Sequence, residues 1–307
     1  MTGAAPADAA GAARQAALLN AMPVVFVLIW STGFVVARFG MPHAPPMGFL
    51  VLRYAFSVVA FLLWILWARA AWPQGRAQWL HLGLTGVMMH AGYLGGVWAA
   101  VKDGLGAGLA ALIVGLQPMI TALWISARGH RHHVSGRQWL GLVLGLAGLL
   151  LVVWHKLHLG EARAFNVGLA VVALASITAG TLYQKRWVRP CDVRTANTVQ
   201  LLGAFVVTAP LALLETEPFE MHPELIGAMA WSVLVLTLGG SSLLYLLIQR
   251  GAATAVTSLM YLVPPCTAVL AWLLFGETLS VLVLAGLVLT AVGVALVVRD
   301  PRPLPST

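Results

Sequence analysis

Apolar residues recur along the chain in runs that are long enough to cross a membrane as helices. A hydrocarbon layer of ~30 Å requires about 20 helical residues at a rise of ~1.5 Å each. Short connections separate the runs, and none of them is long enough to form a separate folded domain. An all-α membrane protein is therefore expected. The pattern predicts ten spans, at residues 21–37, 47–67, 78–100, 107–126, 138–154, 167–184, 196–214, 225–248, 255–275 and 279–298.

Composition agrees with this pattern and narrows the class of protein. Of the 307 residues, 60% are hydrophobic and only 9% are charged, and the mean hydropathy is +0.88. So few charges could not cover a water-soluble fold, whereas a helix bundle in lipid needs polar groups only at its ends and in internal cavities. The expected surroundings are therefore the lipid bilayer. No nucleic-acid partner is expected, because the basic residues behind the net charge of +8 lie mainly in the connections.

The distribution of these basic residues predicts how the chain is oriented. Cytoplasmic connections of membrane proteins carry an excess of Lys and Arg. With a cytoplasmic N-terminus, the cytoplasmic side receives 13 of the 18 basic residues, namely Arg14, Arg69, Arg76, Arg128, Arg131, Arg137, Lys185, Arg186, Arg189, Arg194, Arg250, Arg299 and Arg302. The other side receives Arg38, Lys102, Lys156 and Arg163. We therefore expect a multi-pass protein of a bacterial-type inner membrane, with both termini (residues 1–20 and 299–307) in the cytoplasm.

Several features recur at a shift of about 146 residues, which indicates an internal repeat. The endings LAGLLLVV (146–153) and TAVGVALVV (290–298) match in character, and single residues match in register. The single-residue pairs are Gly104 with Gly251, Pro118 with Pro264, Thr121 with Thr267, Gly141 with Gly286, and Gly148 with Gly293. The two halves, residues 21–154 and 167–298, each contain five predicted spans. Because five is odd, the second half is inverted in the membrane, as in carriers that hold their substrate between two halves.

The sequence also resembles a known family, on motifs that lie in both halves. These are WSTGFV (30–35), the prolines and arginine of PPMGFLVLRY (45–54), a proline in the fourth and ninth spans, and FGETLS (275–280). From about residue 21 to 298 the chain is similar to the EamA-type branch of the drug/metabolite transporter superfamily, and within it to YddG-like exporters of amino acids and related metabolites. The resemblance implies ten helices and export of a small solute. The glycine-glutamate pair typical of the family occurs only in the second half, as Gly276 and Glu277, and Glu277 is expected to act in structure or gating.

Polar residues inside membrane spans are costly and are therefore candidates for a site. No Asp or Glu falls within a predicted span. Arg53 does, and its equivalent at a shift of 147 is the neutral Gln200. Arg53 is expected to face the bundle interior or the outer mouth, where it either anchors or gates the two halves or contacts a substrate carboxylate. Gln200 is expected to act with it in structure or gating.

Aromatic residues within the spans suggest the walls of a binding site. Trp30 lies midway through the first span, and in the third span Tyr93 and Trp98 flank a helical stripe that contains His90, Leu94 and Val97. The repeat equivalent of Trp98 is Tyr245. Aromatic faces with a few polar groups suit zwitterions, because a ring face also attracts an ammonium group. The other interpretation is that these aromatics fill helix contacts and that His90 is a neutral residue bonded to a neighbouring helix.

Prolines occupy equivalent positions in spans four and nine. Gln117 and Pro118 correspond in position to Pro264 and Pro265. A proline frees a backbone carbonyl and kinks a helix, so each position offers a binding acceptor or a hinge, and Gln117 is a candidate for substrate binding.

Metal and ATP chemistry receive little support. The segment GHRHH (129–133) has no Cys, Asp or Glu near it, so no metal is expected there. A phosphate-binding Gly-Lys-Ser/Thr loop is absent from the sequence. We therefore expect no cofactor and no ATP-hydrolysing subunit.

These patterns predict a carrier, not an enzyme, that exports amino acids or related metabolites by alternating access. A carrier of the same fold for another solute stays open. A drug-like cation would favour an acidic cavity residue, and a nucleotide-linked sugar would favour several Lys or Arg, whereas only Arg53 is expected in the cavity. An intramembrane hydrolase that uses Ser241 or Ser242 with His90 is the alternative of another class.

Overall fold

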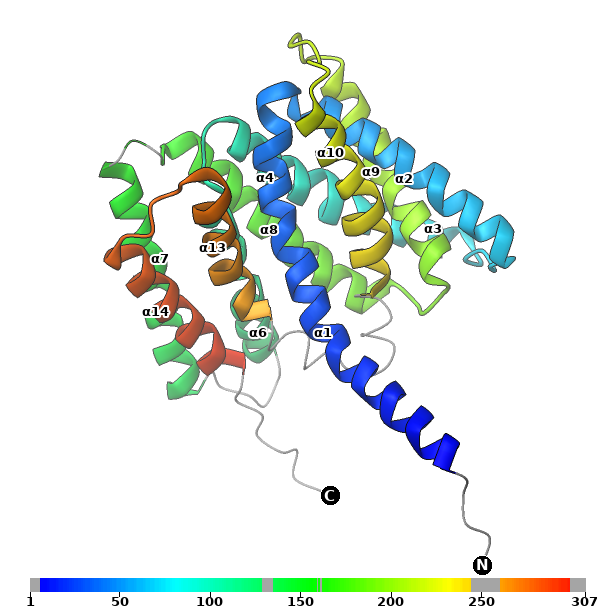
Figure 1. Ribbon diagram of the computed structural model, residues 1–307, viewed down its shortest axis with the longest axis horizontal. Helices are drawn as coiled ribbons and strands as arrows, with labels where there is room; N and C mark the ends of the chain where they lie inside the picture. Colours follow the sequence, from blue (N-terminus) through cyan, green and yellow to red (C-terminus); the bar gives the residue numbers. More distant parts are fainter. Residues whose placement is uncertain (1–5, 129–134, 159, 161, 244–259, 299–307) are drawn as a thin grey trace, which may run out of the picture.

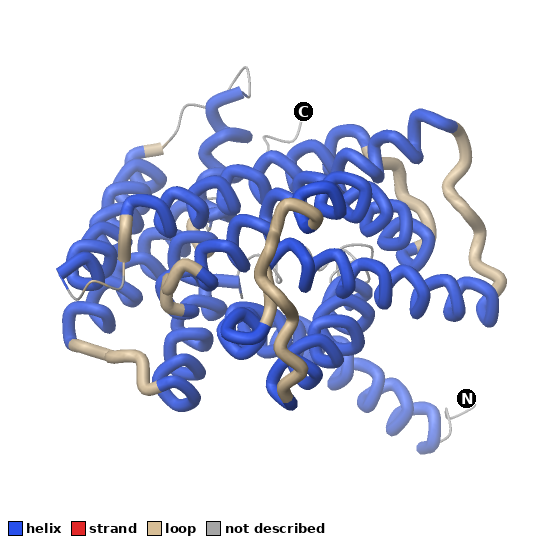
Figure 2. The backbone as a smooth tube through the Cα atoms, turned by 90° about the horizontal axis from the view of Figure 1, so that it is seen from above, coloured by secondary structure: helices blue, strands red, loops and turns tan. Residues whose placement is uncertain are grey.

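The computed structural model describes residues 6–128, 135–158, 160, 162–243 and 260–298, and within these ranges every regular element is a helix. The helices lie side by side in one bundle, with the connections at its ends (Figures 1 and 2). The prediction of an all-α fold is confirmed.

The first half of the chain supplies nine helical elements. They are α1 (Pro6–Gly40), η1 (Met41–His43), α2 (Pro46–Ala68), α3 (Arg76–Gly86), η2 (Val87–Gly92), α4 (Tyr93–Lys102), α5 (Ala107–Val114), α6 (Gln117–Arg128) and α7 (Gly136–His158). The second half supplies, in its described part, α8 (Ala164–Trp187), α9 (Val193–Ala212), α10 (Pro223–Trp231), η3 (Ser232–Ser241), η4 (Met260–Leu262), α13 (Val263–Phe275) and α14 (Val281–Val298).

Eight helical segments of the described chain have the length and apolar character needed to cross a membrane, and α13 and α14 are shorter apolar helices. The eight segments coincide in position with predicted spans one to eight. Parts of spans eight and nine, residues 244–248 and 255–259, lie outside the described residues. At the N-terminus, α1 is helical from Pro6, within the segment predicted as a tail, which agrees with the high helix propensity of its many alanines.

The acidic segment, residues 215–224, defines one face of the bundle. It follows α9 and leads into α10, and Lys102 at the end of α4 lies beside it. We call this side the acidic-segment face. The helix α1 begins and α14 ends on the opposite side (Figure 1).

Helices α7 and α14 pack against each other through glycines. A Cβ placed at Gly148 would lie 2.5 Å from the carbonyl oxygen of Gly286, and one placed at Gly141 would lie 2.6 Å from that of Gly293. Such a contact brings the two backbones into direct apposition, as small residues do in membrane helix pairs. Gly141, early in α7, contacts Gly293, late in α14, whereas Gly148 contacts the earlier Gly286, so the two helices are antiparallel.

Several spans are not continuous α-helices. Span three contains the π-helical turn η2, span eight contains the π-helical stretch η3, and span four is broken at Gly115 and Leu116, between α5 and α6. A π-helical turn widens the helix, shifts side chains around it and is frequent at functional sites. These irregular segments border the cavity described next.

Candidate functional site

A cavity of ≈1080 Å³ lies inside the bundle. Its walls come from both halves of the chain, mainly from α1, η2, α4, α6, α8, α9 and η3. Eight of the twelve residues predicted as binding, gating or structural line it, namely Trp30, Arg53, His90, Tyr93, Trp98, Gln117, Pro118 and Gln200. The structure thus brings together residues that are up to 170 positions apart (200 − 30).

The cavity extends from Arg53 and Trp98 toward the C-terminal end of α8. Lys185 and Arg189 line it there, at the side opposite the acidic-segment face. The sequence-based expectation that Arg53 is the only basic residue in the cavity is therefore wrong. The two additional cations were missed because a basic residue at a span end is ordinarily explained by topology alone.

Near the same end, Asp192 begins α9 as its N-cap. Its carboxylate accepts a hydrogen bond from the backbone N–H of Arg194 at 2.9 Å. Hydrogen bonds from the Arg194 side chain hold the pKa of the Asp192 carboxyl below its ordinary value of 3.8. The carboxylate is thus bound by its own helix, which fixes where α9 starts beside the cavity.

Arg53 is buried, with 6% of its surface exposed. Its Nε and Nη2 groups donate to the hydroxyl of Thr237 in η3, at 3.2 and 3.1 Å. That hydroxyl in turn donates to the carbonyl of Ser232 at 2.8 Å. The guanidinium carbon lies 6.0 Å from the centre of the Trp98 ring. Arg53 therefore joins α2 of the first half to η3 of the second half and faces the bundle interior.

His90 and Gln200 form a second polar pair beside the cavity. The Gln200 side chain interacts with the ring of His90, and the hydroxyl of Tyr54 donates to the His90 carbonyl at 3.0 Å. His90 belongs to the π-helical turn η2, where the carbonyls are not all used by a regular helix ladder.

The aromatic residues divide into two groups by exposure. Trp98 is 1% exposed and its ring stacks on Phe49 at 4.4 Å, while Trp30 is half-buried and lies 5.2 Å from Phe26. Seven other tryptophans near predicted span ends are instead exposed, as expected for interface anchors. They are Trp67, Trp72, Trp79, Trp124, Trp139, Trp154 and Trp187.

Gln117 lies at the start of α6, directly after the break in span four. Its amide Nε2 donates to the hydroxyls of Thr121 at 3.4 Å and Thr181 at 3.3 Å. Thr181 and the buried Asn197 also line the cavity and were not predicted. Both are small polar residues that bond to a carbonyl of their own helix, a use that gives no distinct sequence signal.

Three of the remaining predicted residues lie elsewhere, and one is not described. Pro264 and Pro265 occupy the first turn of α13, where a proline is tolerated because its missing N–H has no helical partner anyway. Glu277 follows α13 and accepts a hydrogen bond from the backbone N–H of Ala107, at the start of α5, at 2.9 Å. Tyr245 and the segment GHRHH (129–133) lie outside the described residues.

Replacing Glu277 by alanine is expected to lower the unfolding temperature of the protein. The N–H of Ala107 loses its acceptor, and the loss of a helix cap costs about 0.5–2 kcal/mol. Thermal unfolding of the purified protein in detergent measures the change. Glu220→Ala is the control, because the Glu220 side chain is 72% exposed. Equal unfolding temperatures for the two variants would contradict the capping role.

The acidic segment covers the end of the bundle that faces away from Lys185. Lys102 Nζ donates to the Glu217 carboxylate and to the Met41 carbonyl, the latter at 2.8 Å. The Glu215 carboxylate accepts from the backbone N–H groups of Met47 and Gly48, at 3.0 and 2.8 Å. These contacts hold the acidic segment on η1 and on the first turn of α2, and none of the residues that make them lines the cavity.

Comparison with known proteins identifies the family. The sequence model of the EamA-like transporter family matches residues 17–154 and 165–299. The chain therefore belongs to the EamA-like transporter family, as the sequence motifs predicted. Its class is that of a membrane transporter and not of an enzyme.

Individual relatives agree with this class. YedA of Escherichia coli K12, named an uncharacterized inner membrane transporter, is 27% identical over 82% of this chain and 81% of its own length. A protein of Salmonella typhimurium named a probable amino-acid metabolite efflux pump is 25% identical over 89% of this chain and 92% of its own. One solved crystal structure has the same fold, with a TM-score of 0.66 at 18% identity over 92% of this chain and 97% of that one. The relatives support a multi-pass protein of the inner membrane.

Proposed function

We propose that the protein exports amino acids or related small metabolites by alternating access between two inverted five-helix repeats. The observation that carries the proposal is the central cavity. It holds a buried arginine beside Trp98 and reaches Lys185 and Arg189 at one face of the bundle, whereas no residue of the acidic segment at the other face lines it. Alternating access needs a site of this kind, which one side can reach while the other is sealed.

The contact between α7 and α14 supports the repeat. At a shift of 145 residues, Gly141 corresponds to Gly286 and Gly148 to Gly293 (286 − 141 and 293 − 148). Gly141 meets Gly293 and Gly148 meets Gly286, so the partners are exchanged. A two-fold axis between the helices produces this exchange. Helices α7 and α14 run antiparallel, as a two-fold axis in the membrane plane requires.

The polar pairs at the cavity support the same symmetry. At a shift of 147 residues, Arg53 corresponds to Gln200 and His90 to Thr237 (200 − 53 and 237 − 90). Arg53 contacts Thr237, and Gln200 interacts with His90. The π-helical segments η2 and η3 contain the two partners. The family model also matches the chain twice, once in each proposed repeat.

The proposed orientation assigns an access state to the structure. If the basic connections are cytoplasmic, the Lys185 end of the cavity is open to the cytoplasm and the acidic-segment face is outside. The structure then corresponds to an inward-facing state that is ready to load a cytoplasmic solute. Opening of the contacts made by Lys102 and Glu215 would release the solute outside.

The chemistry of the cavity favours a small zwitterion or anion. A guanidinium pairs well with a carboxylate, and the rings of Trp30 and Trp98 suit an apolar side chain or an ammonium group. Among the described residues no Asp or Glu lines the cavity, which disfavours a cationic drug. The name of the Salmonella relative supports an amino-acid metabolite. Lys185 and Arg189 make a larger anion, such as a nucleotide-linked sugar, the second candidate.

Uptake of labelled amino acids into proteoliposomes tests the proposal. We expect saturable uptake without an imposed proton gradient, because no described carboxylate lines the cavity to relay protons. Uptake that requires a gradient would instead assign proton coupling to His90. Competition by a nucleotide-linked sugar, but not by amino acids, would transfer the function to the second candidate. Protein that is folded but moves neither class of solute would refute the proposed substrates.

A further inference from the structure

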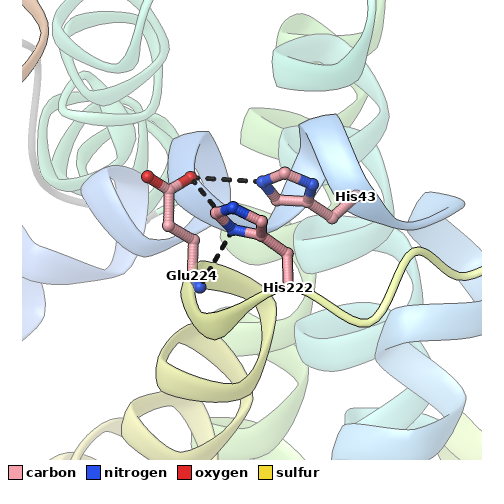
Figure 3. Close-up of side chains that lie close together, drawn as sticks. All are labelled: His43, His222 and Glu224. Atoms are coloured by element: carbon pink, nitrogen blue, oxygen red, sulfur yellow. Dashed lines mark hydrogen bonds and ion pairs between the residues drawn. The ribbon is translucent and has the colours of Figure 1, made fainter.

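We propose that His43, His222 and Glu224 form a Zn²⁺ site that locks the acidic-segment face closed. His43 ends η1, the helical turn after α1, whereas His222 and Glu224 begin α10 (Figure 3). One ligand atom from each residue lies within 4.8 Å of the other two. The set joins the two halves of the chain at the acidic-segment face.

The distances fit a tetrahedral ion after a small movement. His43 Nε2 lies 3.2 Å from Glu224 Oε2, and His222 Nδ1 lies 4.0 Å from the same oxygen. Two atoms that each lie about 2 Å from Zn²⁺ in a tetrahedral site are ~3.3 Å apart. His222 also accepts a long hydrogen bond, at 3.3 Å, from the backbone N–H of Glu224. Metal binding would replace that bond and leave the N–H to water.

The two histidine rings stack face to face, and one of them must turn when a metal binds. They stack with their centres 4.2 Å apart and their planes 14° from parallel. A bound metal lies in the plane of each imidazole ring, so the exposed His222 ring turns out of the stack when the ion binds. Two imidazole nitrogens and one carboxylate oxygen are a ligand set that Zn²⁺ prefers, with a water molecule in the fourth position.

The second nitrogen of His43 already has a supporting group. Its Nδ1 atom is buried and has no hydrogen-bond partner among the described residues. The Glu220 carboxylate lies 3.7 Å from it. When a metal takes Nε2, the ring hydrogen resides on Nδ1 and points at Glu220. A carboxylate behind a metal-bound histidine orients the ring and strengthens its bond to the metal.

The site is open to an ion from solution, because the side chains of His222 and Glu224 are 48% and 47% exposed. This step rests on the proposed function: in alternating access, the two segments that carry the ligands separate when this face opens. Zn²⁺ therefore binds the closed state better than the open state and shifts the population toward it. The ion would act as an inhibitor from this face and not as a transported solute.

Zinc chloride added to the purified full-length protein, carrying an affinity tag without histidine, tests the site. We expect one Zn²⁺ bound by calorimetric titration and a higher unfolding temperature. His222→Ala and Glu224→Gln should weaken binding at least tenfold, and both replace exposed side chains. Glu220→Gln should weaken it by about tenfold, since loss of a supporting carboxylate costs roughly 10–100-fold in affinity.

His158→Ala is the matched control, because His158 is exposed at the end of α7 and is not in the cluster. Its affinity for Zn²⁺ should equal that of the unchanged protein. The proposal is overturned if the unchanged protein binds no Zn²⁺, if His222→Ala binds it equally well, or if His158→Ala loses as much affinity. Binding is measured without any solute, so this test does not depend on the proposed export activity.

Discussion

Arg53→Ala is expected to reduce amino-acid transport by about 10–100-fold in protein that still folds. A hydrogen bond between a charged group and its partner contributes about 1.5–3 kcal/mol, and the variant removes the guanidinium that would pair with a substrate carboxylate; it also removes the bond to Thr237. The measurement is the concentration dependence of uptake in proteoliposomes, with folded protein quantified by size-exclusion chromatography. Arg53→Lys should give an intermediate loss, because an ammonium group keeps the charge but not the two-pronged geometry of the guanidinium.

Thr237→Val is the matched control for Arg53. It removes the same link between α2 and η3 but leaves the guanidinium in the cavity. We expect it to lower the maximal rate by less than about threefold, an effect below ~0.7 kcal/mol, and to leave KM nearly unchanged. An equal loss of rate in Thr237→Val and Arg53→Ala would show that Arg53 acts by anchoring the two halves and not by binding the solute.

Gly148→Ala is expected to destabilise the protein by about 1–3 kcal/mol, the usual cost of overpacking a close contact. The added methyl would lie 2.5 Å from the Gly286 carbonyl oxygen and 2.8 Å from the Thr290 nitrogen, and backbone atoms cannot turn aside as a side chain can. The expected result is a lower unfolding temperature in detergent and a smaller folded yield from membranes.

Gly168→Ala provides the comparison for this change. Gly168 lies in α8, and a Cβ there would meet no atom within 4 Å. Alanine favours a helix over glycine by about 1 kcal/mol, so this variant should be as stable as the unchanged protein or slightly more so. An unfolding temperature of Gly148→Ala as high as that of Gly168→Ala would mean that α7 and α14 can separate without cost.

The helices could be predicted from the sequence because hydropathy decides which segments enter lipid. Residues 47–67 were expected as a span, and α2 covers Pro46–Ala68; residues 138–154 were expected, and α7 covers Gly136–His158. The π-helical segments within spans three and eight could not be predicted. The π-helical η3 is held partly by the bond from Thr237 to Ser232 and by the approach of Arg53, and such contacts exist only in the folded bundle.

The cavity residues that could be predicted are the polar ones that lie within apolar spans. Arg53, His90 and Gln117 are costly in lipid, so each had to face an interior surface. Asn197 lies next to the start of its span, where polar residues are ordinary, and it was therefore missed. The contacts of the acidic segment were also missed, because the pairing of Lys102 with Glu217 depends on segments 115 positions apart.

The exchanged glycine contacts of α7 and α14 have an implication for the origin of the chain. If the chain is the inverted repeat proposed above, this surface meets its own inverted copy and would be available to a five-helix protein before any gene duplication. Two copies inserted in opposite directions would pair through the same glycines, and fusion of the two genes would then join an assembly that already existed. On the proposed repeat, later divergence gave one copy Arg53 and the other Gln200, a difference that two identical subunits could not have.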